Sequence, residues 1–405
     1  MQRPVSIALV VLLGLAGSLA FLFGGDRKPP AGGDQRSSTV TVRGLVDPSS
    51  APYFADPQVR REFAARGLRV EVGTMPSAQM ARSTTADFEA YDFVFPSNLP
   101  LAEKIQEDAG AATSFSPFYS PLVIATTRDV ARALGEAGVA KRVGGYWLLD
   151  FEAYLDLVAE GTRWDDLAKR SHEGAPGQGT PRYASPTRVL VTTADPRTSD
   201  SATLYVALAS YVANDAAVVS SRSELRRVRP LVARLFRGRP TAPTAPTAAS
   251  DLPIGAELDV GRGRQMVAIL ESEFVSRYVE RRKLADRTSK SASATATPTA
   301  SASPTRSSDP IAGDTVLLYP RPTAIAKHTL VPMTTRGDTL GKLLVNDGKL
   351  RSLAADLGFR TANRAAFAGV IEEQRVPAPE DVAKVAGTPS FDMLQNLVSA
   401  VTALD

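Results

Sequence analysis

Hydrophobic and polar positions alternate along this chain in two ways, as short β-branched runs and as longer stretches with helical spacing. The first β-branched run covers 39–46 and ends in the turn sequence 47–50. Asp56 and Pro57 then predict a helix to about residue 65, because aspartate caps helix N-termini and proline suits the first helical position. Gly67 predicts the end of this helix.

The same alternation continues to the end of the chain. Strands are expected at 68–72, 91–95, 115–119, 122–127, 188–193, 266–270, 315–319 and 328–333. Helices are expected at 100–109, 129–137, 151–160, 201–212, 223–236, 339–345 and 350–357, with a helical C-terminal extension over 363–405. Strands that alternate with helices indicate an α/β fold with a largely parallel sheet.

The N-terminus carries an export signal. Residues Val5 to Phe23 are uncharged, and at 1.5 Å per helical residue this run is just long enough to cross a hydrocarbon core of about 30 Å. The sequence Ser18-Leu19-Ala20 fits a signal-peptide cleavage site, whereas the length of the run favours an uncleaved anchor. Both readings of segment 1–25 predict that the body of the protein is exported, after a spacer at 26–38.

Two low-complexity segments interrupt the alternation, at 240–250 and 287–310. Both consist mostly of Ser, Thr, Ala and Pro, which offer too little apolar surface to offset the entropy of ordering. Strand patterns continue on both sides of each segment, so we expect disordered insertions within one fold rather than domain boundaries.

Composition excludes several classes of function. Hydrophobic residues make up 43% of the 405 residues and charged residues 22%, so the chain is not disordered throughout. The absence of cysteine excludes disulfides, cysteine zinc sites, thiol nucleophiles and a lipidated N-terminal cysteine. The net charge of +4 is too small to indicate a nucleic-acid partner.

Catalytic motifs are weak or missing. No Gly-x-Ser-x-Gly occurs, and the two histidines, His172 in a Gly/Pro-rich loop and His328 at a strand start, are expected to be structural or solvated. The arginines between Arg222 and Arg239 fit the solvated face of an amphipathic helix better than a polyanion contact. We therefore predict no enzyme activity, no cofactor and no metal, and keep a cell-wall hydrolase as the least favoured reading.

Polar side chains follow the predicted strands at the points where these end. In α/β sheets, ligands bind outside the carboxyl ends of strands, where helix N-termini present free N–H groups. Ser, Asn and Asp at such positions are also ordinary helix caps, and only the number of these positions favours a polar ligand site. The candidate residues are Ser49, Ser50, Ser97, Asn98, Tyr119, Ser199, Ser201, Thr203 and Glu271.

Three stretches together resemble a known family. They are Tyr-Asp-Phe-Val-Phe-Pro-Ser at 91–97, Asp-Pro-Arg-Thr-Ser-Asp-Ser at 195–201, and Lys-Leu-Arg-Ser-Leu-Ala-Ala-Asp-Leu-Gly-Phe-Arg at 349–360. With the exported leader and the Leu-Tyr-Pro at 318–320, they resemble the extracellular solute-binding proteins of ABC transporters, in the actinobacterial substrate-binding-domain group.

The resemblance implies a type 2 periplasmic-binding-protein fold with two lobes and a double hinge. One lobe is expected to comprise 39–126 with 314–362, and the other 127–286. Ser49, Ser50, Ser97, Asn98, Ser199, Ser201 and Thr203 are then expected to face the ligand, with Tyr119 and Glu271 as further candidates. Two carboxylates beside these contacts, Asp200 and Glu271, disfavour phosphate or molybdate as the ligand.

The sequence therefore predicts an exported, membrane-anchored or secreted protein that captures a small polar solute for ABC-type uptake. The expected partners are that solute, an ABC permease and the membrane. The alternative is an exported scaffold of the same fold that binds a protein or cell-envelope partner without a small-molecule ligand.

Overall fold

The computed structural model describes residues 39–173, 183–237, 265–280, 315–382 and 384–403. The leader, the spacer and both low-complexity segments lie outside the described residues. Within the described part of the chain, no helix combines the length and apolarity needed to span a membrane.

The first part of the chain builds a parallel unit. Strand β1 (Val40–Val46) lies between β2 (Leu68–Thr74) and β3 (Phe93–Phe95), and it pairs parallel with both. The short α1 (Ala51–Ala55) and α2 (Pro57–Ala65) connect β1 to β2. The Asp56 carboxylate accepts the first N–H groups of α2, which confirms the predicted cap, and Gly67 has the positive φ (70°) of a helix-ending glycine.

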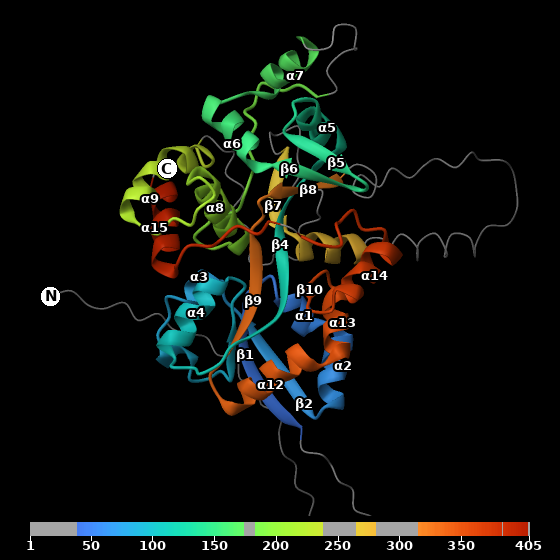
Figure 1. Ribbon diagram of the computed structural model, residues 1–405. Coiled ribbons are helices and arrows are strands. Elements are labelled where there is room, and N and C mark those ends of the chain that lie inside the picture. Colours follow the sequence, from blue (N-terminus) through green and yellow to red (C-terminus); the bar gives the residue numbers. More distant parts are fainter. Residues whose placement is uncertain (1–38, 174–182, 238–264, 281–314, 383, 404–405) are drawn as a thin grey trace, which may run out of the picture. The chain divides into compact units, whose positions relative to one another are not determined.

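The centre of the sheet is antiparallel. Two strands run side by side through it, β4 (Phe115–Thr127) and β9 (Ile325–Pro332) (Figure 1). β9 also pairs antiparallel with β3, and β4 with β8 (Thr315–Arg321), β7 (Met266–Leu270) and the short β10 (Arg360–Thr361). The hairpin of β5 (Ala140–Val143) and β6 (Tyr146–Asp150) completes the order β2-β1-β3-β9-β4-β8-β6-β5. The expectation of a largely parallel sheet was therefore wrong, because chain segments that return late in the sequence pair antiparallel with the early strands.

Two local expectations were also wrong. The strands expected at 115–119 and 122–127 are one continuous strand, β4, which passes through Pro121. Tyr119 therefore lies within a strand and not at its end. Segment 188–193 makes only isolated bridges in the described structure, from Arg188 to Arg163 and from Thr192 to Val267.

The predicted helices are present, with ends shifted by a few residues. They are α4 (Leu99–Asp108), α5 (Arg128–Glu136), α6 (Phe151–Glu160), α8 (Asp200–Ala213), α9 (Arg222–Arg234), α12 (Thr335–Asn346) and α13 (Gly348–Asp356). The C-terminal extension contains α14 (Arg364–Gln374) and α15 (Phe391–Thr402). The sequence analysis did not predict α3 (Ser77–Met80), a 3-10 turn (Thr85–Phe88) or α7 (Trp164–Glu173).

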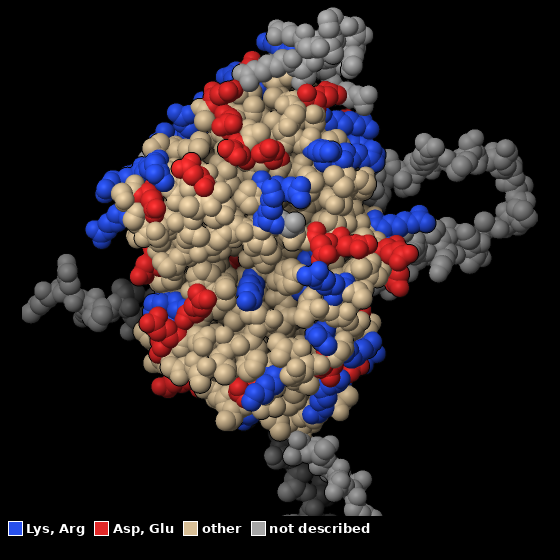
Figure 2. Space-filling model, in the orientation of Figure 1, with Lys and Arg blue, Asp and Glu red and all other residues tan. Residues whose placement is uncertain are grey.

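The arginines of α9 face solvent, as the amphipathic pattern predicts. Val228, Val232 and Ala233 are buried on the other side of this helix. Figure 2 shows basic side chains over the region of α9, and elsewhere on this face acidic and basic groups are interspersed.

In the described part of the chain, apolar side chains form four clusters, and two of them are named here. The core on the β1 side contains Phe54, Phe93 and Phe118, and we call it the β1 core. The core around α8 contains Tyr154 and Tyr205, and we call it the α8 core.

A third cluster joins the two sides. In it, Ala207 of α8 and Leu394 of α15 pack with Leu101 of α4 and Val331 of β9. Helix α8 is buried along nearly its whole length because it contacts structure on both sides.

Candidate functional site

The candidate site lies where the ends of the first three strands meet the beginning of α8. Asp47 follows β1, Ser77 begins α3 after β2, and Ser97 follows β3. Because β1, β2 and β3 are parallel, their carboxyl ends lie at the same edge of the sheet. The carboxyl of Asp200, the first residue of α8, contacts Ser77 at this edge.

The Asp200 carboxyl is the centre of this group. It is 8% exposed, and its Oδ2 accepts a hydrogen bond from the Ser97 hydroxyl. The same oxygen lies 2.5 Å from the Ser77 hydroxyl oxygen, which is also 3.0 Å from Oδ2 of Asp47. Two buried carboxyl groups are thus connected through one serine hydroxyl.

The environment favours the neutral form of Asp200. Burial raises the pKa of the Asp200 carboxyl well above its ordinary value, and the nearby Asp47 carboxylate raises it further. The hydroxyls of Ser77 and Ser97 oppose the increase without reversing it. The raised pKa of Asp200 favours the protonated carboxyl, which can both donate and accept a hydrogen bond.

Asn98 follows Ser97 and occupies the N-cap position of α4, but its side chain makes no capping hydrogen bond. It is 1% exposed, and within the described residues neither its side-chain nitrogen nor its oxygen has a hydrogen-bond partner. An unpaired buried amide costs free energy, and such groups in native proteins call for an explanation.

Ser50 contacts the buried histidine of the β1 core. Its hydroxyl lies 2.8 Å from Nδ1 of His328, whose ring packs against Phe95, Phe118 and Phe359. Burial lowers the pKa of His328 to about 4, although the Asp47 carboxylate acts in the opposite direction. His328 is neutral at pH 7 and lies in the apolar interior. Ser49 binds Asp47 through both its N–H and its hydroxyl.

The candidate residues of α8 stabilise the beginning of that helix. The Ser199 hydroxyl accepts from the N–H of Ala202 and lies 3.0 Å from the Ser201 hydroxyl. Thr203 donates to the carbonyls of Pro196 and Ser199. Each of these hydroxyls therefore serves the helix end.

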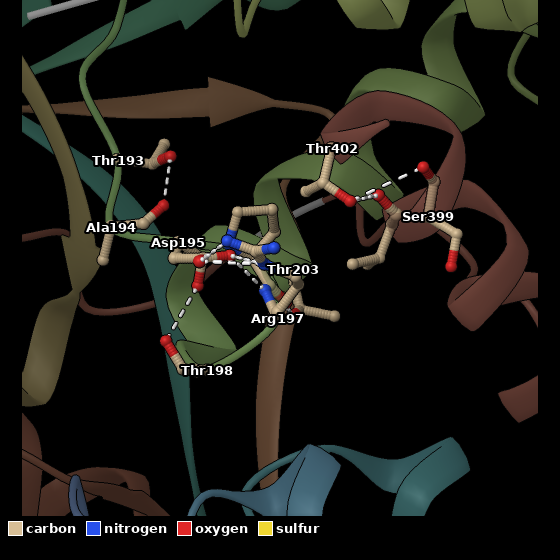
Figure 3. Close-up of polar contacts among 10 residues, drawn as sticks. Thr193, Ala194, Asp195, Arg197, Thr198, Thr203, Ser399 and Thr402 are labelled. Atoms are coloured by element: carbon tan, nitrogen blue, oxygen red, sulfur yellow. Dashed lines mark hydrogen bonds and ion pairs between the residues drawn. The ribbon is translucent and has the colours of Figure 1, made fainter. Parts of the chain in front are cut away.

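The loop before α8 is held by its own polar contacts. In it, Arg197 pairs with Asp195, and the hydroxyl of Thr198 donates to the carbonyl of Asp195 (Figure 3). The position of Asp200 is thus fixed by a locally structured turn.

Glu271 and Tyr119 lie near a different centre, the guanidinium of Arg360. Both carboxylate oxygens of Glu271 accept from Arg360, at 2.6 and 2.9 Å, and Tyr319 donates to one of them at 2.6 Å. Arg360 also donates to the carbonyls of Pro379 and Glu380. Tyr119 pairs with Arg360 across β4 and β10. The charge of Glu271 is thus balanced within the protein.

Sequence reasoning missed Asp47 and Ser77 as parts of the site, and it treated Asp200 only as a carboxylate beside the ligand. Asp47 satisfies the rule of polar residues at strand ends, so the pattern could have included it. Ser77 was missed because β2 was expected to end at residue 72, whereas it extends to Thr74. The contact of Asp200 with Ser77 joins segments 123 residues apart, which no local pattern predicts.

The candidate site contains no metal-binding cluster among the described residues, and the cavity described next lies elsewhere. Within the described residues, no group of three His, Cys, Asp or Glu side chains could hold a metal ion. A cavity of about 190 Å³ is lined by residues that include Asp56, Leu353 and Glu373, and it shares no residue with the Asp200 group.

Comparisons with known proteins identify the fold. No protein-family model and no curated protein matches the chain. Among solved structures, the apo ferric ion-binding protein A of Pasteurella haemolytica matches 90% of this chain and 98% of its own, at 12% identity and a TM-score of 0.51. The sulfate-binding protein SubI of Mycobacterium tuberculosis matches 84% and 92%, at 17% identity and a TM-score of 0.43. The periplasmic molybdate-binding protein of Azotobacter vinelandii matches 80% and 100%, at 10% identity and a TM-score of 0.40. The first likeness shows the α/β fold of periplasmic solute-binding proteins, as the sequence motifs indicated.

Proposed function

We propose that this chain, which has the fold of the type 2 solute-binding proteins, is exported and captures a small polar solute between two lobes for uptake through an ABC-type transporter. The β1 core and the α8 core are proposed as the centres of these lobes. The α8 core also takes in Leu122, Ile124, Val316 and Leu318, which the expected boundaries place in the first lobe. Export is supported by the apolar run at 5–23.

The unpaired amide of Asn98 carries this proposal. A buried amide with two unused hydrogen-bonding atoms is costly unless a partner of the right chemistry pairs with it. Asn98 lies next to Ser97, whose hydroxyl faces Asp200 of the other core. A polar solute bound between the cores would supply the missing partners and contact both sides at once.

The other contacts of the solute are proposed from the same edge. Ser97 and Asn98 contribute from the β1 core, and Ser199 and Ser201 from the beginning of α8. Ser49, Ser50 and Thr203 are also proposed as contacts. Like Ser97, Ser199 and Ser201, they make internal hydrogen bonds, so they contact a solute through their remaining lone pairs. Tyr119 and Glu271 are the least favoured contacts because they surround Arg360.

A ligand screen tests the proposal. The full chain, kept soluble in mild detergent, is screened by thermal shift against sugars, amino acids, oligopeptides, organic acids and inorganic oxyanions. A solute that binds only the native state adds about 2.7 kcal/mol of stability at 100 times its Kd, and this raises the unfolding midpoint. A flat screen on folded protein contradicts solute capture.

Asn98→Ala then localises the site. It removes an amide that has no protein partner, so we expect unchanged or slightly higher stability and a loss of affinity of about tenfold or more. Asn214→Ala is the control, because Asn214 is equally buried but pairs with Arg227 and the carbonyl of Ala217. That variant should lose stability and keep its affinity.

Ser199→Ala/Ser201→Ala tests the α8 side. We expect weaker binding of the solute, together with a loss of about 1 kcal/mol of stability from the missing helix cap. Unchanged affinity in the folded double variant would exclude these two hydroxyls as contacts.

The scaffold is the second candidate, and one observation favours it. Asp200 hydrogen-bonds Ser97 across the two cores, and Leu394 of α15 packs in the apolar cluster shared by both sides. A chain joined in this way can present a constant surface to a protein or cell-envelope partner. A flat screen together with normal stability of Asn98→Ala would favour this reading.

A further inference from the structure

Two carboxyl groups of the candidate site lie on either side of one hydroxyl oxygen. Oγ of Ser77 is 3.0 Å from Oδ2 of Asp47 and 2.5 Å from Oδ2 of Asp200. The same oxygen accepts the N–H of Ser97 at 3.0 Å. The Ser77 hydroxyl carries a single hydrogen, so it can donate to only one of the two carboxyl groups.

A proton on Asp200 completes the hydrogen bonds. The oxygens of Asp47 already act as acceptors, because they accept the N–H and hydroxyl of Ser49 and the N–H of Ser77. The Ser77 hydroxyl then donates to Asp47, and a protonated Asp200 donates to Ser77. The Ser97 hydroxyl donates to Asp200, and each hydrogen is used once.

We infer that the edge formed by Asp47, Ser77 and Ser97 is a binding site for a protonated carboxyl group, and that the chain's own Asp200 occupies this site. The inference rests on the proposed function, since it names the chemical class of the solute as a small carboxylic acid. Such a solute displaces Asp200 and presents the same donor and acceptor. The unpaired amide of the neighbouring Asn98 provides a second contact for the rest of the molecule.

This arrangement sets the specificity of the site. A fully ionised anion such as sulfate has no hydrogen to donate toward Ser77, and it would lie close to the negative Asp47. A carboxylic acid fits without this repulsion. The same balance makes the contact between the two cores depend on pH, because an ionised Asp200 would face Asp47 across Ser77. His328 of β9, which also interacts with Asp47, is kept neutral by burial.

Chemical rescue provides the test, since the side chain of aspartate beyond Cα is an acetic acid. We expect Asp200→Gly, made in the full chain, to lower the thermal midpoint. At pH 5, where part of added acetate is acetic acid, 100 mM acetate should raise the midpoint of this variant by about 2 °C or more relative to chloride. The wild type should show no such rise, because acetic acid lacks the second contact with Asn98 and cannot displace the tethered Asp200 at this concentration.

Asp392→Gly is the matched control. Asp392 also lies in the first turn of a helix, α15, but it is exposed, so the variant introduces the same backbone freedom without opening the site. A folded Asp200→Gly without an acetate response, or with the response of Asp392→Gly, would overturn the inference.

Asp200→Asn keeps the test decisive if Asp200→Gly does not fold. The amide retains the shape, with an N–H donor for Ser77 and a carbonyl oxygen that accepts, so this variant should keep the contact and lose its pH dependence. Because the pKa of Asp200 is raised on folding, its stabilising contribution is complete below the ordinary aspartate pKa and declines as pH rises towards the raised value. From about pH 4 upward, the unfolding equilibrium constant of the wild type should increase by up to tenfold per pH unit relative to that of Asp200→Asn.

The free energy of unfolding is measured against pH for the wild type and for Asp200→Asn. The difference between these two curves removes the contribution of His328, which both proteins share. Parallel curves would overturn the inference. The outcome is separable from the proposed function: acetate rescue with a flat solute screen supports the carboxyl site and contradicts solute capture. A solute found by the screen, without acetate rescue of Asp200→Gly, supports solute capture and contradicts the carboxyl site.

Discussion

Ser97 and Asp200 are 103 residues apart in the sequence, and the hydroxyl of Ser97 donates to the buried carboxyl of Asp200 between the two cores. Ser97 owes its position to the end of β3, and Asp200 owes its position to the first turn of α8. The bond therefore reports on the relative placement of two elements that no local interaction connects.

Ser97→Ala should lower stability, because it removes a donor from a buried carboxyl. We expect a loss of about 2 kcal/mol in the free energy of unfolding, measured with denaturant at pH 5. Ser399→Ala, on the exposed face of α15, should change it by less than about 0.5 kcal/mol. Equal effects of the two substitutions would show that the Ser97 contact contributes nothing.

The ion pair of Glu271 and Arg360 should be costly to break from one side. Both side chains are almost fully buried, so Arg360→Met leaves an uncompensated charge and should cost about 3–5 kcal/mol. The double variant Glu271→Gln/Arg360→Met should recover part of this loss, since it also removes the charge. Arg364→Met breaks an exposed pair with Asp381 and should cost less than about 1 kcal/mol. A loss from Arg360→Met no larger than that of Arg364→Met would contradict the buried pair.

His328 should make the protein less stable in acid. Its pKa is lowered from 6.5 to about 4 on folding, so its contribution is present above pH 6.5 and is lost as pH falls towards 4. The full loss amounts to about 3 kcal/mol. His328→Asn keeps a polar atom towards Ser50 and should not show this part of the pH dependence when denaturant unfolding is followed from pH 7 to pH 4. Identical pH profiles would place the titration elsewhere.

Two helical glycines should respond oppositely to alanine. A Cβ at Gly337 of α12 would lie 1.9 Å from the backbone carbonyl oxygen of Asp92, which cannot move away cheaply, so Gly337→Ala should cost about 2 kcal/mol or more. Gly369 of α14 has no atom within 4 Å of that position, so Gly369→Ala should stabilise by about 0.5–1 kcal/mol. Thermal unfolding of both variants measures the difference. Similar midpoints would contradict the close approach of α12 to Asp92.

Local chemistry was predictable where one segment determines its own conformation. Asp56, Pro57 and Gly67 predicted the limits of α2 because a cap, a fixed φ and a positive φ act within a few residues. The pattern at 188–193 misled, because its apolar side chains enter the α8 core without a neighbouring strand along their length. Burial gives the same apolar signal in both cases, so periodicity alone did not distinguish them.

The sequence by itself determined most of the helices and strands and a set of hydroxyls near the ends of strands, since these depend on short-range patterns. The fold was indicated by the resemblance of three stretches to solute-binding proteins. The tertiary structure alone decided the antiparallel centre of the sheet, the pairing of Glu271 with Arg360, and the meeting of Asp200 with Ser77 and Ser97. The physical reason is that these relationships depend on which distant segments share a buried space. A carboxylate at a helix start reads as an ordinary cap until the fold brings serine hydroxyls and a second carboxylate against it.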